Sequence, residues 1–213
     1  MKITRIIKKG SKDVVVHFDN GETLILSLVV FLKSGLKKNE VVSEDRSSML
    51  TKENNLFQVK QKALGYLGRR LHSSSELRLK LMQKRYEMEL INNVIKELTH
   101  TGYVNDRNFA RMFIEEKSET KFWGKNKIKS ELIQKGISSK IISEILEECF
   151  SEDNEYEKAK VTARKKIKLF KAKLNNDMEI KEKLISFLNM RGYGFQISRK
   201  VCDELIREED YFN

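Results

Sequence analysis

Residues 77–98 read LRLKLMQKRYEMELINNVIKEL, and they align without a gap with residues 128–149, which read IKSELIQKGISSKIISEILEEC. The apolar residues of the two segments align with one another, at the intervals of three and four that place side chains on one face of a helix. Further along, Lys135-Gly136-Ile137 aligns with Arg191-Gly192-Tyr193 in a third, looser copy. Self-similarity of this kind indicates a tandem array of helical units.

Another amphipathic helix precedes each copy, at roughly residues 58–71, 106–121 and 155–173. We therefore predict a mainly α fold, in which three tandem three-helix repeats touch mainly their neighbours and form an elongated curved body. The predicted boundaries are residues 57–105 for repeat 1, 106–152 for repeat 2 and 153–213 for repeat 3. The residues expected to cap helix starts are Ser73 with Glu76, Asn105 or Asp106, and Asn176 with Glu179.

Residues 1–56 differ from the rest, and we predict a β-rich extension followed by a linker helix. The run KDVVVHFDNGETLILSL, residues 12–28, places two β-rich segments on either side of Asn20-Gly21, a dipeptide that tolerates the backbone of a tight hairpin turn. Residues 3–7 supply a third strand of a small β-meander, and a short helical turn is expected to end at Gly35. The residues expected to alternate on one face of the hairpin are Val14, Val16 and Phe18, and then Leu24, Leu26 and Leu28.

The composition supports helices and a negatively charged partner. The 213 residues include 42 Lys and Arg against 31 Asp and Glu, a formal net charge of +11, and no proline. Because nothing fixes the backbone angle that stops a helix, long helices are favoured, and a disulfide scaffold or a collagen-like chain is excluded. Cys149 and Cys202 align with Leu and Ile in other copies, so we interpret them as core residues. The chain has neither a signal-peptide pattern nor an apolar run of membrane-spanning length, and it is expected to be cytoplasmic.

The sequence offers no recognisable catalytic or metal-binding motif. Its three histidines lack partners at the spacing of metal ligands, and Gly124-Lys125-Asn126 lacks the first glycine and the hydroxyl residue of a phosphate-binding loop. The adjacent carboxylates Glu115-Glu116 and Glu147-Glu148 point apart on their helices. We therefore expect neither an enzyme nor a bound cofactor or metal, although an enzyme with an unrecognised site stays open as a hypothesis.

The basic residues gather in clusters, and one of them, residues 158–173, has eight basic residues and no acidic residue. Such a pattern suits a phosphate backbone or an acidic protein groove, and the alternative is an ordinary solvated face. Trp123 could stack on a base beside its lysines, but capping of the core is the favoured interpretation. The candidate residues for contact with a partner or with DNA are Arg69, Arg70, Arg78, Lys84, Arg85, Lys121, Trp123, Lys125, Lys127, Lys129, Lys135, Arg164, Lys165, Lys166, Lys168, Arg191, Arg199 and Lys200.

Several segments together resemble the RecX family of bacterial regulators of the RecA recombinase. The resemblance is close from Ala63 to Leu146 and looser through the third repeat. The segments that carry it are ALGYLGRRLHSSSELRLKLMQKRY, GYVNDRNFARMFIEE, GKNKIKSELIQKGISSKIISEIL and RGYGFQISRKV. Three sites depart from the family's usual pattern: His72 stands for an arginine, Arg85 for a glycine, and Asn105-Asp106 for an acidic pair.

The resemblance implies a role in DNA repair and homologous recombination within the SOS response. A protein of this family is expected to bind in the groove of a RecA filament on single-stranded DNA and to limit filament growth, ATP hydrolysis and strand exchange. We expect a monomer that touches the RecA filament and the single-stranded DNA, without a membrane partner. The alternative is a free-standing basic DNA-binding module.

Overall fold

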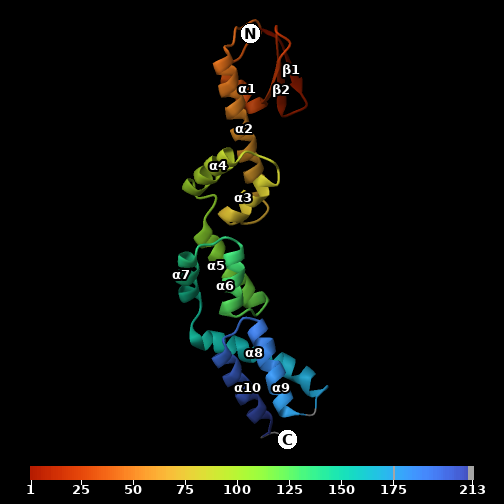
Figure 1. Ribbon diagram of the computed structural model, residues 1–213, viewed down its shortest axis with the longest axis vertical. Coiled ribbons are helices and arrows are strands. Elements are labelled where there is room, and N and C mark those ends of the chain that lie inside the picture. The colour runs from red at the N-terminus through yellow and green to blue at the C-terminus, as the bar shows by residue number, and fades with distance from the viewer. Residues whose placement is uncertain (175, 211–213) are drawn as a thin grey trace. The chain divides into compact units, whose positions relative to one another are not determined.

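The computed structural model of the chain describes residues 1–174 and 176–210 (Figure 1). The predicted mainly helical fold behind a small N-terminal sheet is confirmed. The elements in chain order are β1 (Ile3–Lys9), β2 (Asp13–Phe18), β3 (Thr23–Ser27), α1 (Leu28–Ser34), α2 (Glu44–Leu67), α3 (Ser74–Met82), α4 (Met88–His100), α5 (Asp106–Thr120), α6 (Lys125–Gln134), α7 (Ser139–Cys149), α8 (Glu152–Lys171), α9 (Asp177–Met190) and α10 (Phe195–Asp210). None of the helices in the described ranges has the length and apolar character needed to cross a membrane.

The elements divide into two compact units. The first contains Met1–His72 and Leu77–Val104, and the second contains Ser73–Glu76 and the chain from Asn105 onward. The first turn of α3 therefore belongs to the second unit.

The first unit begins with an antiparallel sheet in the order β1-β2-β3. Its predicted hairpin is present, since Gly21 adopts a φ of 85° and the Glu22 N–H donates to the Asn20 side chain at 3.0 Å. Val14, Val16 and Phe18 are buried with Leu24 and Leu26, as the alternation predicts.

Leu28 departs from that alternation because it begins α1. The Ser27 hydroxyl accepts from the Val30 N–H at 3.3 Å and so caps the helix immediately after β3.

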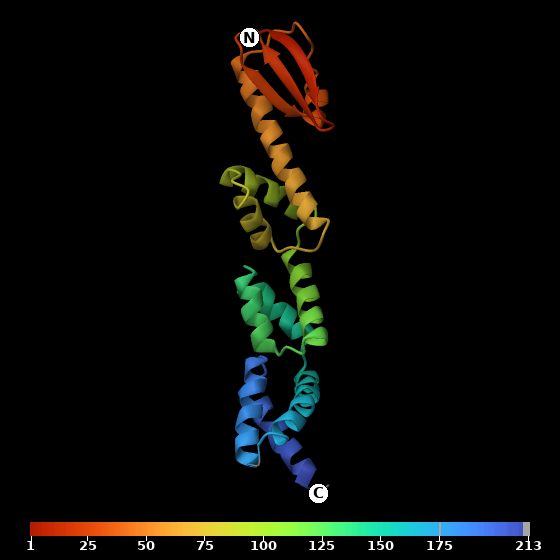
Figure 2. The ribbon, with the colours of Figure 1, turned by 90° about the vertical axis from the view of Figure 1, so that its right-hand side faces the viewer.

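Helix α2 starts beside this sheet (Figure 2) and runs without interruption past residue 56. Residues 44–64 contain neither glycine nor proline, so the linker helix and the first helix of repeat 1 fuse into one. The buried Asn54 on α2 covers the outer edge of β3. Its side-chain oxygen accepts from the Ser27 N–H at 2.7 Å, and its amide nitrogen donates to the Ile25 carbonyl at 3.2 Å.

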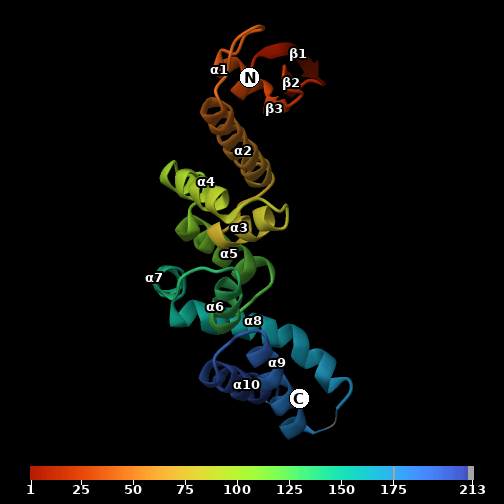
Figure 3. The same ribbon diagram turned by 45° about the horizontal axis from the view of Figure 1, so that its top comes forward.

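After the sheet in chain order, the helices form three-helix groups, α2–α4, α5–α7 and α8–α10, and each group has its own apolar core. Figure 3 shows α8, α9 and α10 packed together. The core residues are Val59, Ala63, Leu77, Leu81, Ile91, Val94, Ile95, Leu98 and Val104 in the first group, Phe109, Ala110, Ile114, Ile128, Leu132, Ile137, Ile142, Ile145 and Leu146 in the second, and Ala159, Ala163, Ile167, Ile180, Leu184, Leu188, Tyr193, Val201, Cys202 and Leu205 in the third.

The cysteines lie where the alignment places them. Cys202 is buried in the third core, and Cys149 packs half-buried against the second. Burial raises the pKa of the Cys202 thiol to about 12, so this side chain is a neutral, apolar residue.

The predicted helix caps are present. The Ser73 hydroxyl accepts from the Glu76 N–H at 3.0 Å, and the Asn105 side chain accepts from the Asn108 N–H at 3.0 Å. The Asn176 side chain accepts from the Glu179 N–H at 3.4 Å. Each bond satisfies a backbone donor that the first turn of a helix leaves without a partner.

One ion pair recurs between the first and third helices of every group. Lys60 pairs with Glu97, Arg111 with Glu148, and Lys160 with Glu204. The sequence alignment superposes Glu97 on Glu148 and Glu148 on Glu204, so these pairs are the same contact repeated.

The second helix of each group ends in a left-handed residue. The three aligned positions are Arg85 with a φ of 61°, Gly136 with 73° and Gly192 with 93°. Glycine adopts this conformation without strain, whereas an L side chain such as that of Arg85 is strained there.

Candidate nucleic-acid and protein interface

The first turn of α6 is held by the end of α9, and both lie in the second unit. The Gly124 N–H donates to the Arg191 carbonyl at 2.8 Å, and the Asn126 N–H donates to the Gly192 carbonyl at 3.0 Å. The Lys125 N–H donates to the Glu155 carboxylate at 3.1 Å. These acceptors satisfy backbone donors that a helix N-terminus leaves open. We call this contact the α6–α9 junction.

Two glycines make the close approach possible. A Cβ atom added to Gly192 would overlap Lys127, and one added to Gly124 would overlap the backbone of Gly192. The α6–α9 junction therefore brings Lys127 next to Arg191 through direct backbone contact.

Aromatic residues from the loop between α5 and α6 complete the junction. The Tyr193 hydroxyl donates to the Phe122 carbonyl at 3.1 Å, and Phe122 adopts a φ of 51°. Trp123 packs half-buried against the core of α5–α7, as the favoured interpretation expects. Burial raises the pKa of the Tyr193 phenol, so it stays a neutral donor.

The cations of this region lie on or beside the aromatic rings. The Lys127 Nζ is 4.7 Å from the centre of the Trp123 ring, and the Lys165 Nζ is 4.8 Å from the centre of the Phe122 ring. The Arg191 guanidinium donates to the Lys121 carbonyl at 2.9 Å. Such contacts stabilise a cation but do not neutralise it.

Part of the predicted site is thus assembled by the fold from α6, α8, the loop before α6 and the end of α9. We call this group the basic–aromatic cluster. Its members are Lys121, Phe122, Trp123, Lys125, Lys127, Lys165 and Arg191.

The other candidates of the second unit lie elsewhere. Lys129 is exposed further along α6, and Arg164 and Lys168 are exposed on α8. The half-buried Lys166 lies 5.2 Å from the Phe170 ring and 5.5 Å from the Phe187 ring, so it covers apolar side chains instead of extending freely into solvent.

Lys135 closes α6 and forms an ion pair with Glu76 at 2.9 Å, while its ammonium lies 5.4 Å from the centre of the Phe113 ring. Sequence reasoning missed Lys117, which lies 5.3 Å from the Phe113 ring and 5.9 Å from the Trp123 ring. Its spacing of four residues from Phe113 on one helix was the available signal.

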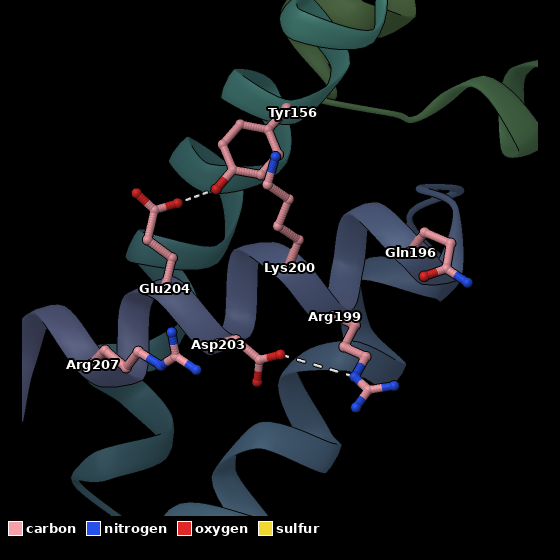
Figure 4. A pocket seen from close by; sticks show the side chains of 7 residues that line it. All are labelled: Tyr156, Gln196, Arg199, Lys200, Asp203, Glu204 and Arg207. Atoms are coloured by element: carbon pink, nitrogen blue, oxygen red, sulfur yellow. Dashed lines mark hydrogen bonds and ion pairs between the residues drawn. The ribbon is translucent and has the colours of Figure 1, made fainter.

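Arg199 and Lys200 line a cavity of about 760 Å³ between α8 and α10 (Figure 4). The Tyr156 hydroxyl donates to Glu204 there, and the Lys200 Nζ lies 4.9 Å from the centre of the Tyr156 ring. Burial, followed by the bond to Glu204, raises the pKa of Tyr156 to about 12. The ion pair with Lys181 lowers the pKa of Asp203. Both carboxylates of this cavity therefore already have cationic or hydroxyl partners.

The remaining candidates belong to the first unit. Arg69 and Arg70 are exposed after α2, and Lys84 and Arg85 are exposed after α3. Arg78 is half-buried and donates to the Asn92 side chain at 3.2 Å.

The side chains of the basic–aromatic cluster are of the kinds that can bind anions and planar groups. Ammonium and guanidinium groups beside aromatic rings recognise phosphates or carboxylates and stack on planar groups. Within the described ranges, no group of three or more His, Cys, Asp and Glu side chains is placed to hold a metal ion.

Comparisons with known proteins agree on one family. The family model of the first three-helix domain of RecX matches residues 60–98, and that of the second three-helix domain matches residues 105–146. The regulatory protein RecX of Clostridium botulinum strain Eklund 17B is 30% identical over 99% of this chain and 99% of its own length. That of Clostridium acetobutylicum is 32% identical over 98% of each chain.

Solved structures show the same fold. A crystal structure of regulatory protein RecX superposes with a TM-score of 0.76 at 19% identity, covering 95% of this chain and 98% of its own. RecX from Lactobacillus salivarius gives a TM-score of 0.65 at 23% identity, covering 72% of this chain and 97% of its own.

Proposed function

The chain belongs to the RecX family, and from this we propose that it regulates the RecA recombinase on single-stranded DNA. It binds in the groove of the RecA filament and limits filament growth, ATP hydrolysis and strand exchange. The observation that carries the proposal is the identity of about 30% with proteins named regulatory protein RecX over nearly the whole chain.

The distribution of charge supports this function. The basic–aromatic cluster offers cations and ring faces to phosphates and bases. Exposed arginines and lysines of the first unit and of α8 add further contacts. Because several weak contacts on one chain reinforce one another through effective concentration, three repeats can hold a filament that each alone would leave quickly.

Inhibition in this proposal is mechanical. The bound protein restrains the rearrangement of RecA protomers, and ATP is hydrolysed only in RecA's own sites. The repeats at residues 57–105, 106–152 and 153–213 act as successive binding modules along the filament.

The first test measures the DNA-dependent ATPase of RecA with increasing amounts of this protein. We expect the rate to fall at amounts well below one regulator per RecA, because one bound regulator restrains several protomers. An unchanged rate at every ratio up to an excess would contradict the proposal.

The alternative, a free-standing DNA-binding module, is favoured by the net charge of +11 alone. It requires tight binding to bare DNA with a steep salt dependence, since each neutralised phosphate releases counterions. Weak binding to bare DNA that strengthens on RecA filaments supports regulation instead.

Two charge-reversal variants test the assignment of cationic residues. Lys165→Glu with Lys168→Glu, and separately Lys125→Glu with Lys129→Glu, are expected to weaken filament association by about tenfold each. Lys166 is left in place because it covers Phe170 and Phe187. The control is Lys140→Glu, an exposed residue of α7 outside the candidate set. If both double variants inhibit RecA as the parent does, these lysines are not part of the interface.

A further inference from the structure

The second unit contains a second junction built like the α6–α9 junction. The first turn of α3 contacts the end of α6, where the Ser73 hydroxyl donates to the Lys135 carbonyl at 2.7 Å. A Cβ atom added to Gly136 would overlap Ser75, just as one added to Gly192 would overlap Lys127. We call this contact the α3–α6 junction.

The acidic residue that completes each junction is also equivalent. Asp106 on α5 accepts from the Ser74 N–H at 2.8 Å in the α3–α6 junction. Glu155 on α8 accepts from the Lys125 N–H in the α6–α9 junction. The two junctions therefore share a bond to the carbonyl at the aligned position before the glycine, a close glycine contact, and a buried or half-buried carboxylate that accepts from a backbone N–H.

The junctions differ at one pair of aligned positions. Glu76 and Lys135 form an ion pair at 2.9 Å in the α3–α6 junction, with side chains 16% and 25% exposed. The sequence alignment places Lys127 at the position of Glu76 and Arg191 at the position of Lys135. Where one junction holds an anion and a cation, the other holds two cations.

The Lys127 and Arg191 side chains contact aromatic rings and a backbone carbonyl. Among the carboxylates that the structure describes, none forms an ion pair with Lys127 or Arg191: the first lies over Trp123, and the second donates to the Lys121 carbonyl. The Glu155 carboxylate of the same junction is buried and accepts from the Lys125 N–H. The backbone contact places Lys127 beside Gly192, so the Lys127 and Arg191 side chains extend from adjoining positions. An external anion within reach of both side chains is favoured by both charges.

We propose that the α6–α9 junction binds a backbone phosphate of single-stranded nucleic acid, held between Lys127 and Arg191. The phosphate occupies the role that the Glu76 carboxylate has in the α3–α6 junction. This site adds a specific DNA contact to the proposed function. Binding of the phosphate does not depend on that function, but the position of the site beside the DNA of a RecA filament does.

The residues around the junction favour nucleic acid over an isolated phosphate or an acidic protein. Lys121, whose carbonyl accepts from Arg191, and Lys165, which lies over Phe122, add further positive charge near the junction, as successive phosphates of one strand require. The half-buried Phe122 and Trp123 lie beneath these cations, and their exposed parts add apolar surface that a strand of bases can contact and a carboxylate side chain cannot.

The decisive variant is Lys127→Glu in the full chain. It recreates the Glu76–Lys135 pair at the α6–α9 junction, and it places an acidic residue in the first turn of α6, which has none. The thermal midpoint is expected to stay or to rise by about 2 °C. Affinity for a fluorescent oligo(dT) is expected to fall about tenfold. The slope of log binding constant against log salt concentration is expected to be smaller in magnitude by about 0.7, the loss of one phosphate contact. Loss of binding then cannot be ascribed to unfolding.

The matched control is Lys140→Glu, which makes the same change of charge at an exposed position of α7. It is expected to reduce oligo(dT) affinity by less than about twofold. An equal loss in both variants would show that only net charge matters and would overturn the site.

The reciprocal variant, Glu76→Lys, converts the α3–α6 junction into the doubly cationic form. It is expected to lower the thermal midpoint and to raise oligo(dT) affinity several-fold more than Glu147→Lys, its control on the exposed face of α7. If Glu76→Lys raises oligo(dT) affinity no more than Glu147→Lys does, two cations at the aligned positions of a junction do not create a phosphate site.

Further measurements separate the sources of the anion. Competition by inorganic phosphate at concentrations equal to those of oligo(dT) phosphate would reveal a site for the free ion and overturn the proposal. If Lys127→Glu weakens binding to RecA without DNA and leaves oligo(dT) binding unchanged, the junction is an acidic-protein site and the proposal is wrong. If wild-type protein fails to inhibit the RecA ATPase while Lys127→Glu still loses oligo(dT) affinity, the proposed function fails and the phosphate site stands.

Discussion

Gly192 shows how a single residue determines contact between helical groups. Its φ of 93° is open to glycine, and its missing Cβ leaves room for Lys127. Arg85, at the aligned position after α3, keeps the left-handed conformation with a full side chain. The same backbone shape thus serves a buried contact at one position and an exposed turn at the other.

Replacement of these two residues is expected to have opposite effects. Gly192→Ala combines backbone strain with overlap at Lys127 and is expected to destabilise the protein by about 2–4 kcal/mol. Arg85→Gly relieves strain and is expected to stabilise it by less than about 1 kcal/mol. Urea unfolding followed by circular dichroism measures both. A Gly192→Ala protein as stable as the parent would contradict the close approach described here.

Residue roles were predictable from sequence where the chemistry is local. The caps at Ser73 and Asn105 and the turn at Gly21 follow from side chains that bond to, or permit, their own backbone. The position of Lys165 over Phe122 was not predictable, because it depends on how α8 packs beside a loop of the preceding group. The left-handed Phe122 gave no sequence signal either, since aromatic residues rarely adopt that conformation.

At the scale of elements, the recurring ion pair is the clearest sign of common construction. It joins the first helix to the third in every group, but its environment changes from one group to the next. Lys160 is 12% exposed and shares Glu204 with the Tyr156 hydroxyl, whereas Lys60 is 36% exposed. Burial makes the loss of a partner more costly.

We therefore expect unequal effects from equivalent substitutions. Glu204→Ala removes a carboxylate that a largely buried ammonium and a phenol both contact, and it is expected to cost about 1–3 kcal/mol. Glu97→Ala breaks an exposed pair and is expected to cost less than about 1 kcal/mol. Chemical denaturation of the two variants under one buffer condition compares them directly. Equal costs would show that exposure does not decide the value of this contact.

Most elements were predictable because their apolar periodicity is strong. Two boundaries were less accurate, for reasons that lie outside local periodicity. Helix α2 continues through residue 56 because the linker contains no residue that ends a helix. Leu28 leaves the strand alternation because Ser27 caps α1, so that Leu28 is the first residue of the helix and not the last of the strand.

The whole chain distributes its stability over separate cores. Within the described residues, buried apolar side chains form one core behind the sheet and one in each three-helix group. The elements also divide into two compact units. Opening of one core therefore need not expose the others.

Native-state hydrogen exchange is expected to resolve at least two sets of amides with different opening free energies, one in each compact unit. The measurement follows exchange rates across low urea concentrations, where sets that open together converge. Convergence of all slow amides of both units on one free energy would contradict this expectation, because it would mean a single cooperative unit.

The net charge of +11 was readable from composition, but its arrangement was not. The fold gathers Lys121, Lys127 and Arg191 at one junction, and it uses Lys135 and Lys160 in ion pairs. Sequence spacing could not separate these two uses, because the residues that neutralise a cation come from other helices.

Arg85 also decides whether another helix can pack against the end of α3. Gly136 and Gly192 each admit the first turn of a preceding helix, and the missing Cβ is what permits the contact. At the aligned position after α3, Arg85 carries a side chain where the two glycines have none. The first turn of another helix therefore could not approach the end of α3 as closely. A change of Arg85 to glycine would remove that side chain and leave the end of α3 with the same free space as the ends of α6 and α9.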